Sequence, residues 1–332
     1  MDNPILAEVT RGNVVESRHR GAAIVVDADG GVVFSAGDVE RPVFPRSAVK
    51  AIQALPLIES GAADRYGLSE AEIALAVSSH SGEPLHAQTS LSMLRKAGRD
   101  AGCLECGAHW PMNEPAARAL AKSGAEPSAL NNNCSGKHAG FVCLSCALEA
   151  DPAGYVKPGH AVQQAVRGAL EAVTGAAHGP DRMGIDGCSI PSYAVPLSAL
   201  ALGFARFGTG RGFGPERARA AARIRAAAAA NPFMVAGTDR YDTRLMGLLG
   251  ARVFSKTGAE GVYCAALPEL GLGLAVKCDD GAGRAAEVAI GALIARFLPM
   301  DEAGQAAFAP LREAVLKNWN GIEVGRVRAP AA

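Results

Sequence analysis

The strand-forming residues of this chain are concentrated at its two ends, and this distribution constrains the fold more than any other feature. Residues 6–35 are rich in β-branched and aromatic side chains, and Asp27–Gly31 reads as a hairpin turn. The segments 251–256, 261–267 and 271–277 return to the same pattern. Both ends of the chain are therefore expected to contribute strands to one sheet.

The middle of the chain has a helical pattern that is punctuated by glycine and proline. The predicted helices span residues 85–96, 136–150, 159–173, 196–207 and 215–230, and a further long helix is predicted over 283–298. We therefore expect an α/β (α+β) fold, in which an antiparallel sheet built from both chain ends packs against helices, with a mostly helical middle region.

Length and composition indicate one large globular unit. With 332 residues, of which 49% are hydrophobic and 20% charged, the chain can bury a large core. We expect a single catalytic unit over residues 1–332, with a sheet region at about 1–45 and 250–332 and a helical region at about 46–249. Lys plus Arg and Asp plus Glu both total 33, so no basic excess favours nucleic acid or an anionic membrane. The expected partners are a small-molecule substrate and other protein subunits.

The sequence carries no visible export or membrane signal. The start has no cationic segment followed by an apolar run, and the longest nearly apolar stretch, residues 194–205, is too short to cross a bilayer. We therefore expect a soluble, cytoplasmic protein whose eight cysteines are mostly reduced.

A Ser-x-x-Lys pattern, Ser47 to Lys50, follows the proline-rich loop 41–45 at the expected start of a helix. Residues three apart on a helix share a face, so the hydroxyl and the amine can meet. A desolvated lysine can take the proton of a serine and make it a nucleophile. The spacing therefore predicts a Ser–Lys nucleophile, although the same spacing also occurs on solvated helices.

Two further stretches carry reactive side chains of the same kind. Residues 78–84 form a polar loop that contains Ser79 and His80, and Lys256-Thr257-Gly258 ends an expected strand. A Lys-Thr-Gly on a strand together with a Ser-x-x-Lys on a helix matches two parts of the serine β-lactamase and penicillin-binding-protein pattern. Gly258 would let a substrate approach the backbone closely.

Cysteines accompany polar residues in two more loops. Cys134 and Lys137 lie three apart at a helix start, and Cys188 follows an expected short strand, so the three side chains could meet. The alternative is that both cysteines are ordinary small buried residues. Cys103 and Cys106, beside His109 and Trp110, are either packing residues or a minor metal site. Cys143 and Cys146 lie in an apolar run and are interpreted as helix packing.

Five motifs in order resemble the asparaginase II family of Rhizobium type, the third structural class of L-asparaginases. They are Arg46-Ser47-x-x-Lys50, the loop 78–84, the stretch 132–138, Asp186-Gly187-Cys188, and the stretch from Ala236 to Arg244. The resemblance runs from about residue 6 to the C-terminal helix. It implies a serine β-lactamase-like and glutaminase-like fold, action on L-asparagine, a homodimer, and a metal site close to the catalytic serines.

The resemblance also implies roles for particular residues. It implies two Ser–Lys pairs, Ser47 with Lys50 and Ser79 with Lys256, and a zinc ion held by Cys134, Lys137 and Cys188. The residues that it implies for substrate binding or orientation are Arg46, His80, Asn133, His138, Asp186 and Gly258. A lysine ligand is unusual, because cysteine and histidine dominate protein zinc sites.

The mechanism expected from these residues is covalent. Ser47, deprotonated through Lys50, would attack the carboxamide carbon of asparagine, while backbone N–H groups near Ser47 or Gly258 hold the oxyanion. Arg46 and Asp186 would recognise the α-carboxylate and α-ammonium groups. Ser79 is either a proton relay or the nucleophile itself. The alternatives are a glutaminase or a β-lactamase-like or peptidase-like serine hydrolase on the same fold, and a non-catalytic amino-acid-binding protein.

Overall fold

The computed structural model describes residues 3–330, which form two compact units. The sheet unit comprises residues 3–48, 194–212 and 252–330, and the helical unit comprises Val49–Tyr193 and Phe213–Ala251. The segment 194–212 thus belongs to the sheet unit, although it lies within the sequence range expected for the helical region. That the whole chain acts as a single catalytic unit remains a prediction.

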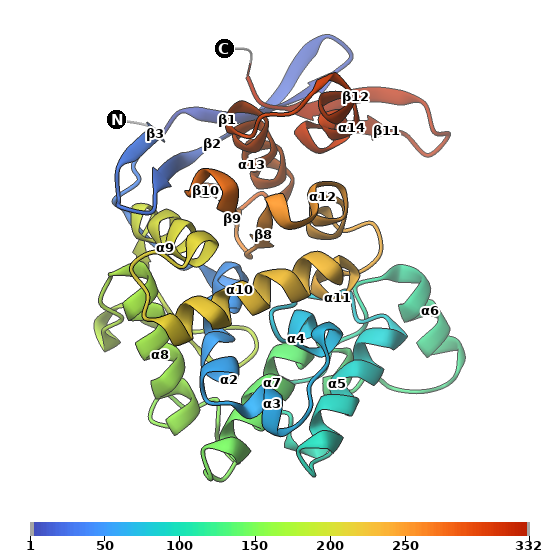
Figure 1. The fold of residues 1–332 in the computed structure, drawn as a ribbon. Helices are drawn as coiled ribbons and strands as arrows, with labels where there is room; N and C mark the ends of the chain where they lie inside the picture. The colour runs from blue at the N-terminus through green and yellow to red at the C-terminus, as the bar shows by residue number, and fades with distance from the viewer. Residues whose placement is uncertain (1–2, 331–332) are drawn as a thin grey trace. The chain divides into compact units, whose positions relative to one another are not determined.

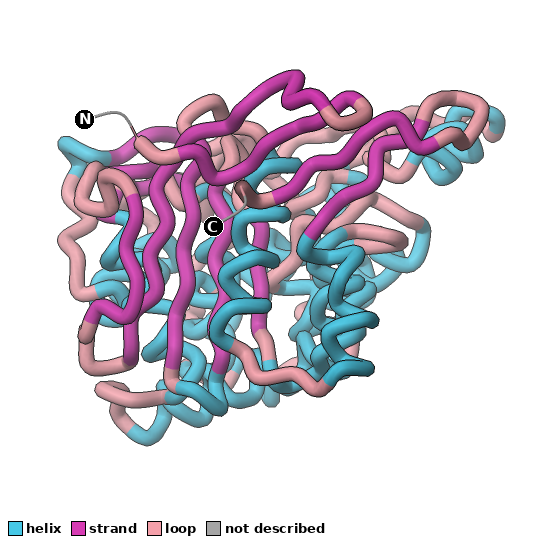
Figure 2. The backbone as a smooth tube through the Cα atoms, turned by 90° about the horizontal axis from the view of Figure 1, so that it is seen from above, coloured by secondary structure: helices cyan, strands magenta, loops and turns pink. Residues whose placement is uncertain are grey.

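The sheet unit is built on an eight-stranded antiparallel sheet with the strand order β11-β12-β1-β2-β10-β9-β8, and β3 pairs with β2 (Figure 2). Its strands are β1 (Ile5–Arg11), β2 (Val14–Asp27), β3 (Val32–Ala36), β8 (Phe254–Thr257), β9 (Val262–Leu267), β10 (Leu272–Cys278), β11 (Glu313–Lys317) and β12 (Glu323–Arg328). A small separate ladder joins β4 (Pro42–Val43) to β7 (Val195–Pro196). The expectation of an antiparallel sheet made from both chain ends is confirmed.

Strand β2 connects the two halves of this sheet because it changes partner along its length. Its first half pairs with β1, and its second half, from Gly21 to Asp27, pairs with β10. A Cβ atom at Gly21 would lie 2.1 Å from the carbonyl oxygen of Lys277, so only glycine fits at the crossing. The following residues Ala22–Val26 are all buried, which is the pattern of a strand that is covered on both faces.

Three helices pack in the sheet unit: α9 (Leu197–Thr209), α13 (Gly283–Phe297) and α14 (Glu302–Arg312) (Figure 1). Helix α9 packs against β2, β9 and β10, and α13 packs against β1, β9, β10 and β12. The contact with α9 is close, since a Cβ atom at Gly273 would lie 1.9 Å from the carbonyl oxygen of Ala201. The small residues of these segments therefore allow helix and sheet backbones to approach.

The helical unit contains short and long helices and one small hairpin. Its α-helices are α1 (Lys50–Gln53), α2 (Leu55–Glu59), α3 (Ala62–Arg65), α4 (Glu70–Ala76), α5 (Pro84–Lys96), α6 (Glu114–Lys122), α7 (Ser135–Ala147), α8 (Ala161–Thr174), α10 (Pro215–Ala230), α11 (Pro232–Ala236) and α12 (Tyr241–Leu249). Its 3₁₀ turns include η2 (Ala101–Cys103), η3 (Ala129–Asn131) and η4 (Pro180–Arg182), and the hairpin joins β5 (Met183–Ile185) to β6 (Pro191–Tyr193). The predicted helices at 85–96 and 215–230 are confirmed almost to the residue.

Helix α7 forms the core of the helical unit, because nearly all of its residues are buried. It packs against α2, α3, α4, α5 and α8. Its closest approach is to α4, where a Cβ atom at Gly136 would lie 2.4 Å from the carbonyl oxygen of Leu75. Since α4 leads into the loop 78–84 and α7 follows the turn that holds Cys134, this contact fixes the spacing between two of the predicted site segments.

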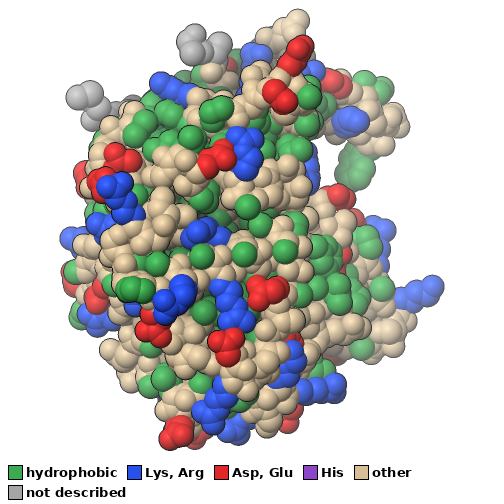
Figure 3. Space-filling view, in the orientation of Figure 1, with side chains coloured by type: hydrophobic (Ala, Val, Ile, Leu, Met, Phe, Trp, Pro, Cys, Tyr) green, Lys and Arg blue, Asp and Glu red, His purple; other side chains and the backbone are tan. Residues whose placement is uncertain are grey.

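The surface carries charges of both signs. Lys and Arg side chains alternate with Asp and Glu side chains on the face shown in Figure 3. Within residues 3–330, no helix is both long enough and apolar enough to span a lipid bilayer.

Candidate active site

Lys50 is the centre of the predicted site in the helical unit. It begins helix α1 and is only 1% exposed. Its Nζ lies 2.6 Å from the carbonyl oxygen of Ser78, 2.9 Å from Ser79 Oγ and 3.1 Å from Cys134 Sγ. One amine therefore joins α1, the loop 78–84 and the turn before α7. The contact with Ser79 differs from the expected pairing of Lys50 with Ser47.

Ser47 lies in a strained stretch of the sheet unit. It is half-buried in the 3₁₀ turn η1 (Arg46–Val49), which directly precedes α1, so the predicted helix start is a 3₁₀ turn rather than an α-helix. Arg46 has a φ of 51°, in the left-handed region that a non-glycine residue adopts only at a cost. Strain of this kind is typical of functional sites, because surrounding contacts must hold it in place.

Four hydrogen bonds hold the loop that carries Ser79 against α11 and the residues after it. The backbone N–H of Ser79 donates to the carbonyl oxygen of Val235 (3.0 Å), and Ser81 Oγ donates to that of Ala236 (3.0 Å). Glu83 accepts bonds from the N–H and the hydroxyl of Thr238, at 2.8 and 2.7 Å. Glu83 was not among the predicted residues, although it stands in the quoted stretch 78–84, and it links that motif to the one that begins at Ala236.

His80 orients the loop from inside the protein. Its Nδ1 accepts a bond from the N–H of Gly82 (3.0 Å), so its Nε2 carries the proton and donates to Ser135 Oγ (2.9 Å). The ring also stacks on His86 at 4.7 Å. Burial, together with the nearby His86 and Lys50, holds the pKa of His80 well below its usual range. Both ring nitrogens are occupied, so the ring has no nitrogen left for a substrate and fits the role of an orienting group.

The three predicted metal ligands lie together. Cys134, Lys137 and Cys188 are all buried, and Lys137 Nζ donates to Cys188 Sγ at 3.0 Å. Cys188 reaches this place on the turn between β5 and β6, where the N–H of Asp186 bonds to Ile190 O (2.8 Å) and that of Ser189 to Asp186 O (2.8 Å).

The two thiols of the cluster differ in acidity. The hydrogen bond from Cys188 lowers the pKa of Cys134 well below its ordinary value, with help from Lys50 and Lys137. The same hydrogen bond, together with burial, raises the pKa of Cys188. Burial alone would lower the pKa of Lys137, but Cys188, Cys134 and Asp186 raise it overall. Cys134 is therefore the more acidic thiol of the pair.

This donor set fits a metal ion such as zinc in chemistry and in position. Two sulfur atoms and one amine nitrogen are gathered in one buried cluster, and a thiolate, which is the form that binds zinc, is already favoured at Cys134. Among residues 3–330, no group of three or more His, Cys, Asp or Glu side chains could hold a metal ion. The predicted set contains only two such residues and depends on Lys137 as the third ligand.

His138 and Asn133 flank this cluster. His138 is fully buried, its Nδ1 lies 2.5 Å from the hydroxyl of Tyr155, and its Nε2 has no partner within the described residues. Asn133 is half-buried and places its Oδ1 3.1 Å from Cys134 Sγ. Both residues therefore lie beside the cluster, and their predicted roles toward a substrate remain predictions.

Gly258 lies beside the stretch that carries Ser47, but its N–H group is not available to an oxyanion. A Cβ atom at Gly258 would lie 2.6 Å from Pro45 O and 3.4 Å from Ala48 Cβ, so the close approach requires glycine. The N–H of Gly258 donates to Val262 O at 2.8 Å, within the turn between β8 and β9. That backbone N–H groups near Ser47 or Gly258 hold the oxyanion stays a prediction, and the Gly258 N–H itself is already bonded. Lys256, on β8, is fully buried, and its Nζ lies 3.0 Å from Thr257 O.

The remaining cysteines with clear contacts serve packing. Cys106 is buried with its thiol 3.5 Å from Ala129 O, and burial raises its pKa to about 12. Cys143 has its thiol 3.5 Å from Met93 O, and burial likewise raises its pKa to about 12. These thiols stay protonated at neutral pH, as expected for packing residues.

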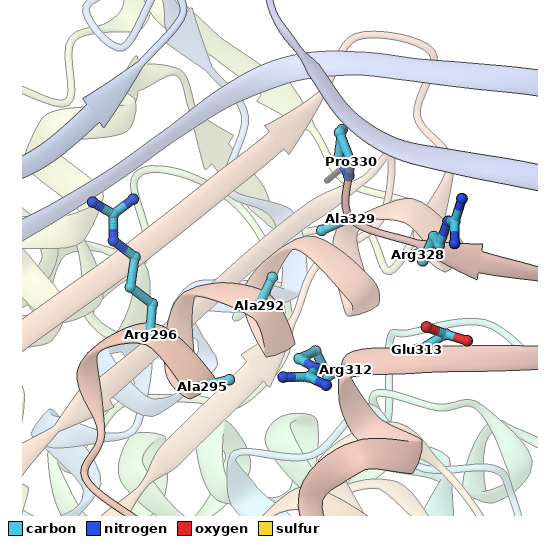
Figure 4. A pocket seen from close by; sticks show the side chains of 8 residues that line it. All are labelled: Ala292, Ala295, Arg296, Arg312, Glu313, Arg328, Ala329 and Pro330. Atoms are coloured by element: carbon cyan, nitrogen blue, oxygen red, sulfur yellow. The ribbon is translucent and has the colours of Figure 1, made fainter. Parts of the chain in front are cut away.

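A pocket of about 330 Å³ in the sheet unit contains none of the predicted site residues. It is lined by Ala292, Ala295, Arg296, Arg312, Glu313, Arg328, Ala329 and Pro330. Figure 4 shows that the guanidinium groups of Arg296, Arg312 and Arg328 do not converge on a common point. Arg296 instead stacks on Phe34, 4.8 Å from its ring centroid. The pocket therefore offers no focused anion site.

Comparison with known proteins decides the family. The family model described as L-asparaginase II matches residues 7–329. The chain belongs to the L-asparaginase II family. The predicted resemblance is thereby confirmed over nearly the whole chain, and the protein is an enzyme of the amidohydrolase class. No curated protein matches the chain.

Solved structures show more distant similarity. One is a β-lactamase from Mycobacterium bovis, with 14% identity over 84% of this chain and 95% of that chain, at a TM-score of 0.42. Another is described as Mglu, with 15% identity over 85% of this chain and 69% of that chain, at a TM-score of 0.38. At TM-scores below 0.5, these similarities support no conclusion about the fold or the function of this asparaginase-family chain.

Proposed function

We propose that this protein hydrolyses L-asparagine to L-aspartate and ammonia through a lysine-activated serine. The observation that carries the proposal is the 2.9 Å contact between the buried Lys50 Nζ and Ser79 Oγ, in a chain of the L-asparaginase II family. A serine hydroxyl needs a neighbouring base to become a nucleophile or to relay a proton, and a buried amine can be that base.

Lys50 Nζ is held by three hydrogen-bond acceptors. It donates to Ser78 O, Ser79 Oγ and Cys134 Sγ. To act as the base, Lys50 would first give up one proton, and its lone pair would then accept the hydroxyl of Ser79. The arrangement thus supports proton transfer from Ser79 to Lys50.

The reaction follows in two steps. Ser47 attacks the carboxamide carbon of asparagine while its proton passes through Ser79 to Lys50, and the proton is then given to the leaving nitrogen, so that ammonia departs. Water next attacks the ester, and the same groups carry its proton, so that aspartate leaves and Ser47 is restored. Ser79 as the nucleophile, with Lys50 or Lys256 as its base, is the alternative assignment.

Recognition of the substrate uses its opposite charges. A free amino acid presents an α-carboxylate and an α-ammonium group, and we assign Arg46 to the first and Asp186 to the second. Asn133 and His138 flank the site as polar groups, and we keep Gly258 as a further substrate-binding position.

Cys134, Lys137 and Cys188 would hold a zinc ion. When bound, it would supply a fixed positive charge that orders the two loops carrying these ligands. Binding must displace the protons of Cys188 and Lys137, so the affinity should rise with pH. We further propose a cytoplasmic homodimer that binds neither nucleic acid nor membrane.

The test is ammonia release from L-asparagine, with L-glutamine and the β-lactam nitrocefin as competing substrates. Wild type should release ammonia from asparagine, and Ser47→Ala, Ser79→Ala and Lys50→Met should each lose at least about a hundredfold in kcat/KM. Ser145→Ala is the control matched to Ser79→Ala, because Ser145 is also buried but only donates to Ala150 O at 3.1 Å. Intact-mass detection of an acyl-enzyme in Ser79→Ala, but not in Ser47→Ala, would assign the nucleophile.

The outcomes separate the alternatives. A glutamine preference would make the protein a glutaminase, and nitrocefin hydrolysis without ammonia release would make it a β-lactamase-like hydrolase. Binding of asparagine without any turnover would indicate an amino-acid-binding protein. Full activity in both serine variants would refute the serine mechanism.

A further inference from the structure

The segment from Cys106 to Asn113 lies between two parts of the candidate active site. Asn132 Nδ2 donates to the carbonyl oxygens of Cys106 (2.9 Å) and Gly107 (3.1 Å), which anchors the start of the segment to the turn before α7. The N–H of Asn113 donates to Ser81 O (3.0 Å), which anchors its end to the loop that carries Ser79. This bridging segment, residues 106–113, therefore connects the Cys134 turn with the Ser79 loop.

His109 makes the central contact of the bridging segment. The backbone N–H of Asn133 donates to His109 Nε2 at 2.9 Å, and His109 Nδ1 donates to Trp110 O at 2.7 Å. Since Nε2 accepts, the ring is the tautomer with its proton on Nδ1. His109 therefore binds a main-chain group, with its other nitrogen committed to its own segment.

The backbone of Asn133 connects His109 to the candidate active site. Its carbonyl oxygen accepts the backbone N–H of His80 at 3.1 Å, directly after Ser79. The next residue in the chain, Cys134, has its Sγ 3.1 Å from Lys50 Nζ. Asn133 thus connects three segments. Its N–H binds His109, its C=O binds the Ser79 loop, and it is itself part of the turn that holds Cys134.

The packing around this connection leaves little room for adjustment. Gly82 has a φ of 73°, and a Cβ atom there would lie 2.8 Å from Asn131 O and 2.9 Å from Pro111 Cα. The Ser79 loop, the bridging segment and the turn before α7 therefore meet backbone against backbone at this point. A shift of any one of these three segments must therefore move the other two.

We propose that His109 is a positioning residue for amide hydrolysis, which acts through the Asn133 peptide to hold Ser79 and Cys134 in place relative to Lys50. The proposal rests on the proposed function for its catalytic part. Without an acceptor at Nε2, the Asn133 N–H loses its partner, and the two loops lose the contact that sets their spacing. A displacement of about 1 Å in such a site lowers the rate by roughly a hundredfold.

The chain offers a matched control histidine. His160 is also half-buried, its Nδ1 accepts the N–H of Val162 (3.1 Å), and its Nε2 donates to Asp151 O (2.8 Å). It makes the same pair of ring contacts at the start of α8, and none of its hydrogen bonds involves a predicted site residue. His160→Ala therefore measures what the loss of such a histidine does to the fold in general.

The experiment combines hydrogen exchange with kinetics on full-length protein. In His109→Ala we expect faster amide exchange in peptides covering residues 78–82 and 131–136, and a kcat for asparagine lowered by roughly ten- to a hundredfold with KM changed by less than about threefold. The Oε1 of a glutamine lies about as far from the backbone as the Nε2 of histidine. His109→Gln should therefore keep the exchange protection and most of the kcat of wild type. Asn has the shorter reach of Nδ1, so His109→Asn should not. His160→Ala should match wild type in both measurements.

Each result has a distinct meaning. Unchanged exchange at 131–136 in His109→Ala would overturn the proposal, and so would equal rescue by Gln and Asn or full kcat despite faster exchange. If wild type released no ammonia from asparagine, the proposed function would fail. Exchange at 78–82 in the same variants would then still decide whether His109 holds the Ser79 loop.

Discussion

Gly136→Ala should weaken the helical unit at the contact that spaces the two halves of the site. The new Cβ atom would lie 2.4 Å from Leu75 O and 2.4 Å from Leu75 Cγ. A leucine side chain can rotate, but the carbonyl oxygen cannot retreat without moving α4. The helices must therefore separate, and the loop 78–84 that follows α4 must move with them.

The expected loss of stability follows from two opposing effects. Overpacking a buried site costs about 1–3 kcal/mol, and a clash with backbone belongs at the upper end of that range. Alanine in place of helical glycine returns up to about 1 kcal/mol. We therefore expect a net destabilisation of roughly 2 kcal/mol. Gly140→Ala, one turn later, is the matched control: its Cβ would meet only side-chain atoms, Leu57 Cδ2 at 3.3 Å and Ala76 Cβ at 3.4 Å.

Urea unfolding of both variants, followed by circular dichroism, gives the comparison. Gly140→Ala should lie within about 1 kcal/mol of wild type, while Gly136→Ala should be less stable by roughly 2 kcal/mol and lose activity at least tenfold. Equal stability of the two variants would show that α4 and α7 do not touch as closely as described, and the reasoning would be refuted.

Three further predictions concern charge, metal and hydrogen bonding. Glu72 is buried; burial opposes its ionisation, but its hydrogen bonds to Lys96, Ser69 and Ser92 lower its pKa below the ordinary 4.5. The stabilisation that ionised Glu72 contributes is therefore present above about pH 4.5 and lost as the pH falls through the lowered pKa. At pH 7, Glu72→Gln should be less stable than wild type by roughly 2 kcal/mol. Urea midpoints measured across pH should show this difference in stability shrinking in acid. Elemental analysis should find zinc lost in Cys188→Ala and kept in the equally buried Cys143→Ala, and equal zinc in both would place the metal elsewhere. Tyr155→Phe should cost roughly 2–3 kcal/mol in thermal unfolding, because His138 Nδ1 and the N–H of Glu105 both lose the phenol oxygen; an unchanged Tm would contradict this.

Hydrophobic periodicity and helix-capping residues predicted the long helices and strands well. They could not predict the local geometry of the short elements. The helix at 215–230 is bounded by Pro215 and Pro232, and the helix at 283–298 ends before Pro299, so its limits are visible in the sequence. Helix α4, which precedes the Ser79 loop, was not among the predicted helices; it is short and begins at a Ser69–Glu72 capping box. Strands β11 and β12 were missed: β11 has no buried residue, and in β12 the alternation is confined to the buried Gly325 and Val327.

The residues of the candidate site could be predicted from the sequence, but which of their side chains contact one another could not. The motifs that carry Lys50, Ser79 and Cys134 were found because each contains an unusual density of reactive side chains. Which of them touch depends on contacts between segments distant in the chain, and no local spacing encodes the Lys50–Ser79 contact. The same limit applies at Gly258, whose N–H donates to Val262 O in the β8–β9 turn, a contact that the sequence does not show.

The pairing of β2 with β10 constrains the order in which the chain can fold during its synthesis. Residues 22–26 leave the ribosome early, but their partner in β10 is translated only after most of the chain, including the helical unit, has emerged. Until then an apolar strand edge stays unsatisfied, a state that favours aggregation. The helical unit, whose residues 49–193 are translated without interruption, can form local contacts well before the sheet closes. We therefore expect recombinant yield to depend on elongation rate and chaperone supply more than on the stability of the finished enzyme.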